Sequence, residues 1–166
     1  MTDIEHRSTS VADRVSNLII GLGLPFERVA HGVAKSADEA AKSRGTPLDM
    51  GGKSLVMKTD RRGFVVLALR GSDAVFNRAL RRHLSIRRYR FATLDELHAL
   101  TGLTPGCVPP FGRPVFDMPL YVEARLAAAD RIAFSAGSHT DSILMATADW
   151  LAAAQPEDVF SFAQDT

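Results

Sequence analysis

The sequence predicts a mixed α/β domain with a mostly antiparallel sheet. Strand-like segments, in which apolar residues alternate or run together, are intermixed with segments whose apolar residues recur at helical spacing. Two pairs of strand-like segments, 50–58 with 64–69 and 131–135 with 142–146, are joined by links of hairpin length. The length of 166 residues, with 46% hydrophobic and 23% charged residues, predicts a single domain, 1–166, with a sizeable core.

Helices are predicted where apolar residues recur at helical spacing and a capping residue precedes them. Ser10 is placed to cap the first helix. Ser36 and Thr93 are each followed three positions later by a glutamate, which is the capping-box arrangement. The predicted helices span residues 11–22, 37–44, 77–84, 94–101 and 123–128, and a closing helix starts at Thr147 or Asp149 and runs to residue 154.

Strands are predicted where apolar and polar residues alternate or where turn residues bound a short apolar run. Residues 64–69, FVVLAL, form a continuous apolar run, which indicates a central strand covered on both faces. Residues 87–91 alternate, and their basic side chains are expected to face outward. Further strands are expected at residues 26–32, 50–58, 115–116, 120–122, 131–135 and 142–146, and the tail after residue 154 is expected to be loose.

Composition excludes several classes of protein. No window has the apolar length that a membrane helix needs. Residues 1–9 are expected to be a flexible leader, and they lack the apolar region of a signal peptide. The single cysteine, Cys107, excludes an intramolecular disulfide and fits a reducing compartment, so a cytoplasmic location is expected.

The formal net charge is only +1, but basic residues cluster in one segment of the chain. Between residues 74 and 94 the chain has six arginines and no acidic residue. Such a cluster can attract the phosphates of a nucleic acid, and the alternative is a solvated helix face. The arginines that charge alone predicts to contact nucleic acid are Arg78, Arg81, Arg82, Arg87 and Arg88.

Residues 102–112, GLTPGCVPPFG, form the most distinctive stretch of the chain. Three glycines and three prolines in eleven positions exclude a helix and a central strand. Val108 and Phe111 are expected to hold this loop against the core. The loop is either a rigid ligand-binding segment with free N–H groups at Gly106 and Cys107, or a structural corner between two elements.

Two further segments are candidates for chemistry. Lys53 follows two glycines and opens an apolar strand, so it can hold a phosphate or a carbonyl oxygen in a cleft, and the alternative is a surface lysine. Residues 135–142, SAGSHTDS, form a polar turn that can bind an anion through the N–H groups of Gly137 and Ser138 or serve as an ordinary hairpin turn. The histidines lack metal-ligand spacing, so no metal is predicted, and no cofactor motif is present.

Four motifs occur in one order along the chain. They are A-x-E-x-A after His31, then GGKSLVMK, TGLTPGCVPPFG and FSAGSHTDSI. Together they resemble the YbaK family, the aminoacyl-tRNA editing domains that stand alone or are inserted in prolyl-tRNA synthetase. The match covers about residues 31–150. The resemblance implies a largely antiparallel sheet curled toward a barrel and surrounded by helices, and it implies hydrolysis of the ester that joins a wrong amino acid to tRNA.

The resemblance also implies roles for individual residues. Those that fall on the functional positions of the family are Lys53, Gly106, Ser135 and Gly137. Lys53 is implied to contact the aminoacyl ester or the terminal adenosine, and Gly106 to bind substrate through its backbone. Several members have a carboxylate five positions after the glycine, where this chain has Ser142, one residue after Asp141. The candidates for substrate binding are His31, Cys107, Ser138, His139, Asp141 and Ser142.

The expected activity is a trans-acting aminoacyl-tRNA deacylase without a cofactor. Small residues in the loop and the turn favour a small amino acid, alanine, cysteine or serine, with tRNA-Pro as the expected tRNA. Aminoacyl-tRNA is the expected partner, and an aminoacyl-tRNA synthetase is a further candidate. Two alternatives stay open: a non-catalytic RNA-binding or regulatory module on the same fold, and a small-molecule hydrolase.

Overall fold

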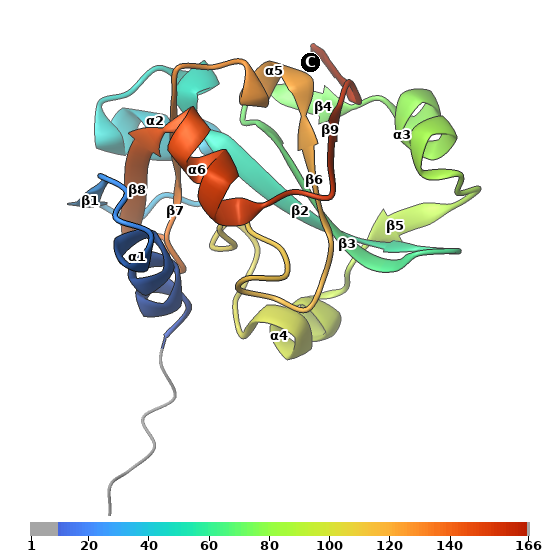
Figure 1. Cartoon of the computed structure of the whole chain (residues 1–166), viewed down its shortest axis with the longest axis horizontal. Coiled ribbons are helices and arrows are strands. Elements are labelled where there is room, and N and C mark those ends of the chain that lie inside the picture. Colours follow the sequence, from blue (N-terminus) through green and yellow to red (C-terminus); the bar gives the residue numbers. More distant parts are fainter. Residues whose placement is uncertain (1–9, 166) are drawn as a thin grey trace, which may run out of the picture.

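Two layers of strands, with helices around them, make up the fold (Figure 1). The computed structural model describes residues 10–165, and the leader expected at residues 1–9 lies outside the described residues. The strands divide among three sheets, ordered β1-β8-β7, β10-β4 and β5-β2-β3-β6-β9. Every pair is antiparallel except β3 with β6 and β6 with β9. The mixed, largely antiparallel architecture is the one predicted from the sequence.

The five-stranded sheet is built on the predicted hairpin of β2 (Gly52–Thr59) and β3 (Gly63–Arg70). Its register runs from the pair Gly52 with Arg70 to the pair Thr59 with Gly63. Residues 65–69 of β3 are fully buried, which confirms a central strand covered on both faces. The sheet is completed by β5 (Tyr89–Phe91), β6 (Leu120–Glu123) and β9 (Asp158–Phe160).

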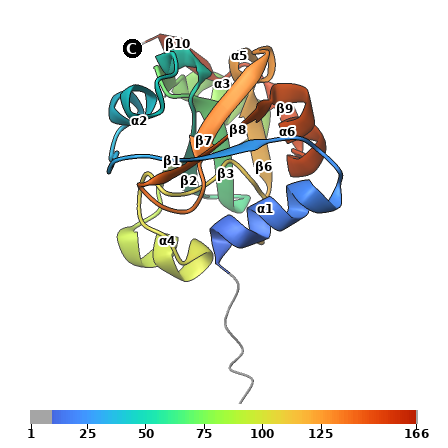
Figure 2. The same cartoon turned by 90° about the vertical axis from the view of Figure 1, so that its left-hand side faces the viewer.

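The three-stranded sheet lies across the other side of the core (Figure 2). It consists of β1 (Glu27–Ala30), β7 (Arg131–Ser135) and β8 (Asp141–Ala146), and β7 and β8 form the second predicted hairpin. A single bridge between Gly51 and Ala133 connects it to the start of β2. The two-stranded sheet pairs β4 (Asp73–Val75) with β10 (Ala163–Asp165).

Three helices begin directly after the capping residues predicted from the sequence, Ser10, Ser36 and Thr93, whereas the helices at 77–84 and 147–154 have no side-chain cap. Ser10 caps α1, and Thr93 with Glu96 forms a complete capping box at α4. At α2, Ser36 accepts from the Glu39 N–H at 3.2 Å, but the Glu39 carboxylate accepts from the Lys35 N–H, one residue before the expected position. The helices are α1 (Val11–Gly21), α2 (Ala37–Arg44), α3 (Asn77–Leu84), α4 (Leu94–Thr101), α5 (Ala124–Ala127), α6 (Thr147–Ala154) and the 3₁₀ turn η1 (Leu48–Met50).

Two hydrophobic clusters pack on the two faces of β3. Val66 and Ala68 pack into one cluster, which also contains Trp150, and Val65 and Leu67 pack into the other. The alternation of side chains along a strand produces this division. The core therefore occupies both sides of the five-stranded sheet, and β2 presents one face to each side.

The loop at residues 102–112 is held against the core as expected. Val108 and Phe111 are buried, and the indole Nε1 of Trp150 donates a hydrogen bond to the Pro110 carbonyl oxygen at 2.9 Å. Gly106 has φ +86°, a left-handed conformation that favours glycine. The loop is therefore rigid and partly buried.

Two local predictions were wrong. No strand forms at residues 115–116, because the N–H groups of Val115 and Phe116 both donate to the Gly112 carbonyl oxygen in a tight turn. Their side chains fill the core from a loop, so burial rather than strand pairing explains the apolar residues. The tail is not loose either, since β9 pairs with β6 and β10 pairs with β4.

The tail should therefore contribute to stability through Phe162, which is fully buried in the second cluster. We expect Phe162→Ala to lower the free energy of unfolding by about 3–5 kcal/mol, because it opens a cavity in a packed core. Val159→Ala, at a neighbouring residue that is 41% exposed, should cost about 1 kcal/mol or less. Urea denaturation of both variants measures this difference, and equal stabilities would contradict the packing of the tail.

Candidate functional site

A small pocket of about 200 Å³ lies where α2, the start of β2, the loop at 102–112 and the end of β7 meet. Lys53, Gly106 and Ser135 line it, although they come from three distant parts of the chain. The structure thus brings together three of the four residues that the family resemblance placed in the site. Gly137, the fourth, does not line this pocket.

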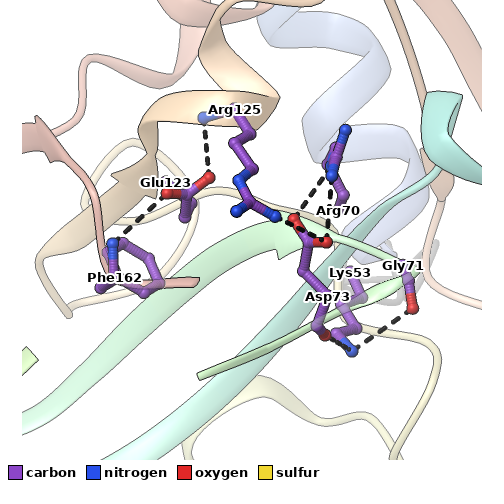
Figure 3. Close-up of polar contacts among 7 residues, drawn as sticks. All are labelled: Lys53, Arg70, Gly71, Asp73, Glu123, Arg125 and Phe162. Carbon is purple, nitrogen blue, oxygen red and sulfur yellow. Dashed lines mark hydrogen bonds and ion pairs between the residues drawn. The ribbon is translucent and has the colours of Figure 1, made fainter. Parts of the chain in front are cut away.

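Lys53 is held by the turn between β3 and β4 (Figure 3). Its ammonium Nζ donates to the main-chain oxygen of Asp73 at 2.5 Å and to that of Gly71 at 3.4 Å. Because an ammonium group has three N–H donors, one remains for a ligand. Lys53 lines both the small pocket and a larger groove beside it, so its ammonium lies at their junction.

Ion pairs fix the turn that holds Lys53. The side chain of Asp73, only 1% exposed, accepts two hydrogen bonds from Arg70, at 2.9 and 3.1 Å, and one from Arg125 at 3.4 Å (Figure 3). Glu123, also buried, accepts from the main-chain N–H groups of Arg125 and Phe162. A buried carboxylate needs such partners, so this cluster fixes the β3–β4 turn and the carbonyl groups that face Lys53.

The same surroundings shift the pKa of Lys53. Burial lowers the pKa of its ammonium, because desolvation disfavours the charged form. The Asp73 carboxylate opposes this and raises the pKa. The ammonium is therefore less solvated than that of a surface lysine, which strengthens its interaction with a substrate oxygen.

Gly106 forms part of the pocket wall, and His139 packs directly behind it. A Cβ atom at position 106 would lie 3.1 Å from Cε1 of His139, so a larger residue would press on the imidazole. His139 is itself fixed by a contact of 2.9 Å between Nδ1 and the Ala34 carbonyl oxygen. His139 thus lies next to the loop without lining the small pocket.

The free N–H group expected at Cys107 is not found, because this N–H donates to the Thr104 carbonyl oxygen at 3.2 Å. The prediction of a free N–H group at Gly137 is also wrong, because this N–H donates to the Cys107 carbonyl oxygen at 3.1 Å. Gly137 has φ +90°, and a Cβ atom there would lie 3.2 Å from the main-chain nitrogen of Ala12. These residues tie the loop, the β7–β8 turn and α1 together.

A hydrogen-bonded chain lies behind the pocket. Nδ1 of His31 lies 2.8 Å from the Gly32 carbonyl oxygen, which can only accept, so Nδ1 carries a proton. Nε2 of His31 contacts the Ser142 hydroxyl at 2.8 Å, and that hydroxyl accepts from Nη1 of Arg44 at 3.1 Å. Ser142 is fully buried, and of these residues only Arg44 lines the pocket.

Arg44 was not among the candidate residues predicted from the sequence. Its position in the last turn of α2, just before Gly45, was the available signal. Burial lowers the pKa of its guanidinium, which nevertheless stays charged. Within residues 10–165 it has no carboxylate partner, so it adds an uncompensated positive charge to the pocket.

Ser54 is a second pocket residue with unusual surroundings. Its hydroxyl oxygen is buried and has no hydrogen-bond partner in the described part of the chain. Gly52, Ser54 and Val56 share one face of β2. A Cβ atom at Gly52 would lie 2.9 Å from the Ile132 side chain, and Val56 belongs to the main core cluster, so this face packs on the core. The buried hydroxyl of Ser54 is therefore closed to a ligand, although the residue lines the pocket.

The two remaining candidates lie away from the pocket wall. Asp141 forms an ion pair with Arg28 at 3.6 Å, at the β1 edge of the three-stranded sheet. Ser138 contacts Thr140 within the turn, with 3.3 Å between their hydroxyl oxygens.

A larger groove of about 690 Å³ adjoins the small pocket at Lys53. Arg81, Arg87 and Arg88 line it, whereas Arg78 and Arg82 are exposed on α3 outside its wall. Between residues 10 and 165, no group of three His, Cys, Asp or Glu residues is placed to hold a metal ion, and no described helix is long and apolar enough to span a membrane.

Comparisons with known proteins show which family the chain resembles. The family model described as "Aminoacyl-tRNA editing domain" matches residues 31–153. The chain is 34% identical over 151 residues to the "Multifunctional Ser/Thr-tRNA deacylase ProXp-y" of Escherichia coli (strain K12), covering 87% of this chain and 88% of that protein. It is also 34% identical over 111 residues to a proline–tRNA ligase of Shouchella clausii (strain KSM-K16), covering 67% of this chain and 19% of the ligase.

Solved structures show the same fold. One, described as a candidate trans-editing enzyme for prolyl tRNA synthetase, has a TM-score of 0.78 at 22% identity and covers 94% of this chain and 98% of its own. Another, the hypothetical protein APE2540, has a TM-score of 0.80 at 18% identity, with 91% and 99% covered. Because the family model spans most of the chain, and the E. coli relative is similar over nearly its whole length, this chain belongs to the aminoacyl-tRNA editing domain family.

Proposed function

We propose that this protein is a trans-acting aminoacyl-tRNA deacylase that hydrolyses the ester of a tRNA charged with a wrong, small amino acid. The observation that supports this most is the position of Lys53, whose ammonium lies where a small pocket meets a basic groove. The pocket suits an aminoacyl group, and the groove suits the RNA attached to it. The activity in the name of the E. coli relative, a tRNA deacylase, agrees with this proposal.

The reaction needs a held ester carbonyl, a placed water and stabilisation of the oxyanion. Water adds to the acyl carbon, the bond from that carbon to the ribose oxygen breaks, and the ribose oxygen leaves as a hydroxyl. The remaining N–H of Lys53 can donate to the ester or to the terminal nucleotide, and Arg44 adds positive charge in the same pocket. The backbone N–H of Gly106 is a further candidate donor, and a ribose hydroxyl of the substrate can activate the water.

The surrounding residues have supporting roles in this proposal. Ser135 lines the pocket next to the acyl group, and Gly137 fixes the turn that follows it. The substrate-binding candidates predicted from the sequence do not line the small pocket, and they act in two groups from behind its wall. His31 and Ser142 hold Arg44, while Cys107, Ser138, His139 and Asp141 shape the loop and the turn.

A pocket of about 200 Å³ favours a small side chain, which agrees with alanine, cysteine or serine. The specificity in the name of the E. coli relative, Ser/Thr, favours serine among these three. tRNA-Pro remains the proposed tRNA, and the likeness to part of a proline–tRNA ligase supports it.

The proposed partner is aminoacyl-tRNA, with an aminoacyl-tRNA synthetase as a further candidate and the cytoplasm as the proposed compartment. Arg81, Arg87 and Arg88 form no ion pair with a carboxylate within residues 10–165, so their charges can meet tRNA phosphates. Arg78 and Arg82 extend the same charge along α3.

The proposal is tested by release of labelled amino acid from tRNA charged with alanine, cysteine, serine or threonine, including mischarged tRNA-Pro. We expect the wild type to hydrolyse at least one of these substrates and Lys53→Ala to lose about 100-fold or more in kcat/KM, because it removes a charged donor at the ester. Lys42→Ala, on the exposed face of α2, is the control and should keep full activity. tRNA binding by the wild type without turnover would indicate a non-catalytic module instead.

A further inference from the structure

The groove beside the small pocket has an apolar floor and a basic rim. Leu55, Met57 and Val75 contribute apolar side chains to it. Arginines line it, and none of the described residues in its wall is acidic. A surface that combines apolar area with positive charge is suited to a ligand with flat, weakly polar rings joined by phosphates.

Two aromatic residues of β5, Tyr89 and Phe91, belong to this groove. Phe91 pairs with Met57 and Tyr89 pairs with Thr59 in the β2–β5 register, so both rings lie on the groove side of the sheet. The Tyr89 hydroxyl donates to the Asn77 side chain, which fixes its ring. Phe91 is 63% exposed. Its large apolar side chain therefore gains little hydrophobic stabilisation in the free protein.

Arginines line the same groove as the exposed ring of Phe91. Among Arg87, Arg88 and Arg90, only Arg90 is neutralised, by a bidentate contact with Glu96 at 2.7 and 3.2 Å. Aromatic rings interleaved with arginines are the pattern by which proteins bind single-stranded nucleic acid, because bases stack on rings while phosphates meet the cations. A base-paired stem would present its phosphates but hide the faces of its bases.

The groove is also continuous with the small pocket. Lys53 and Leu55 line both, so whatever is bonded to an acyl group in the pocket must enter the groove. In an aminoacyl-tRNA this is the unpaired 3′ end. We propose that the groove binds the unpaired 3′-terminal nucleotides of tRNA and that Phe91 is the platform on which one of their bases stacks. This inference rests on the proposed function, because it assumes that tRNA is the substrate.

The test uses uncharged tRNA with its unpaired 3′ end intact and the same tRNA trimmed to a blunt acceptor stem, with binding followed by fluorescence anisotropy. We expect Phe91→Ala to weaken binding of the intact tRNA by about 5- to 100-fold, the effect of losing one stacked base. The variant should bind the trimmed tRNA as the wild type does. Phe91→Tyr, which keeps a ring, should restore most of the affinity for the intact tRNA.

Leu94→Ala is the matched control, because Leu94 is a large apolar residue of the adjoining α4, is 69% exposed and does not line the groove. It should bind both forms of tRNA with wild-type affinity. The inference is wrong if Phe91→Ala leaves the affinity for intact tRNA unchanged, if it weakens both forms equally, or if the wild type binds neither form. Since the probe carries no amino acid, a Phe91-dependent affinity without deacylation would overturn the proposed function alone.

Discussion

The contact between the Lys53 ammonium and the main-chain oxygens of the β3–β4 turn is the interaction on which the site depends. A lysine side chain is flexible, and a free one at the start of β2 would point into solvent. Here two carbonyl groups direct it, and the buried carboxylate of Asp73 fixes those carbonyls through Arg70 and Arg125. The tail contributes as well, because β10 pairs with β4, where Asp165 lies opposite Asp73.

One face of β2 explains why a single lysine borders two cavities. Ser54 and its neighbours two residues away face the main core, whereas Lys53, Leu55 and Met57 share the other face, which borders the groove. Lys53 lies at the end of the strand, where both cavities open. The small pocket and the groove therefore adjoin, and the only described residues that line both are Lys53 and Leu55.

Periodicity and capping residues predicted most of the elements, because these signals are local. The hairpin of residues 50–58 with 64–69 and the capping box at Thr93 were predicted correctly. The β9 and β10 strands were missed, because short strands owe their existence to partners far away in the chain. The cluster around Asp73 could not be predicted either, since its ion pair with Arg125 joins residues that only the fold brings together. The free N–H groups expected at Cys107 and Gly137 were wrong for the same reason.

A double-mutant cycle tests most directly whether Asp73 acts by positioning Lys53. kcat/KM for a charged tRNA would be measured for the wild type, Lys53→Ala, Asp73→Asn and the double variant, with thermal melts to confirm that each is folded. The structure predicts that Asp73→Asn costs about tenfold or more in the wild-type background and almost nothing once Lys53 is absent. An equal loss in both backgrounds would show that Asp73 acts independently of Lys53 and would contradict this account of the site.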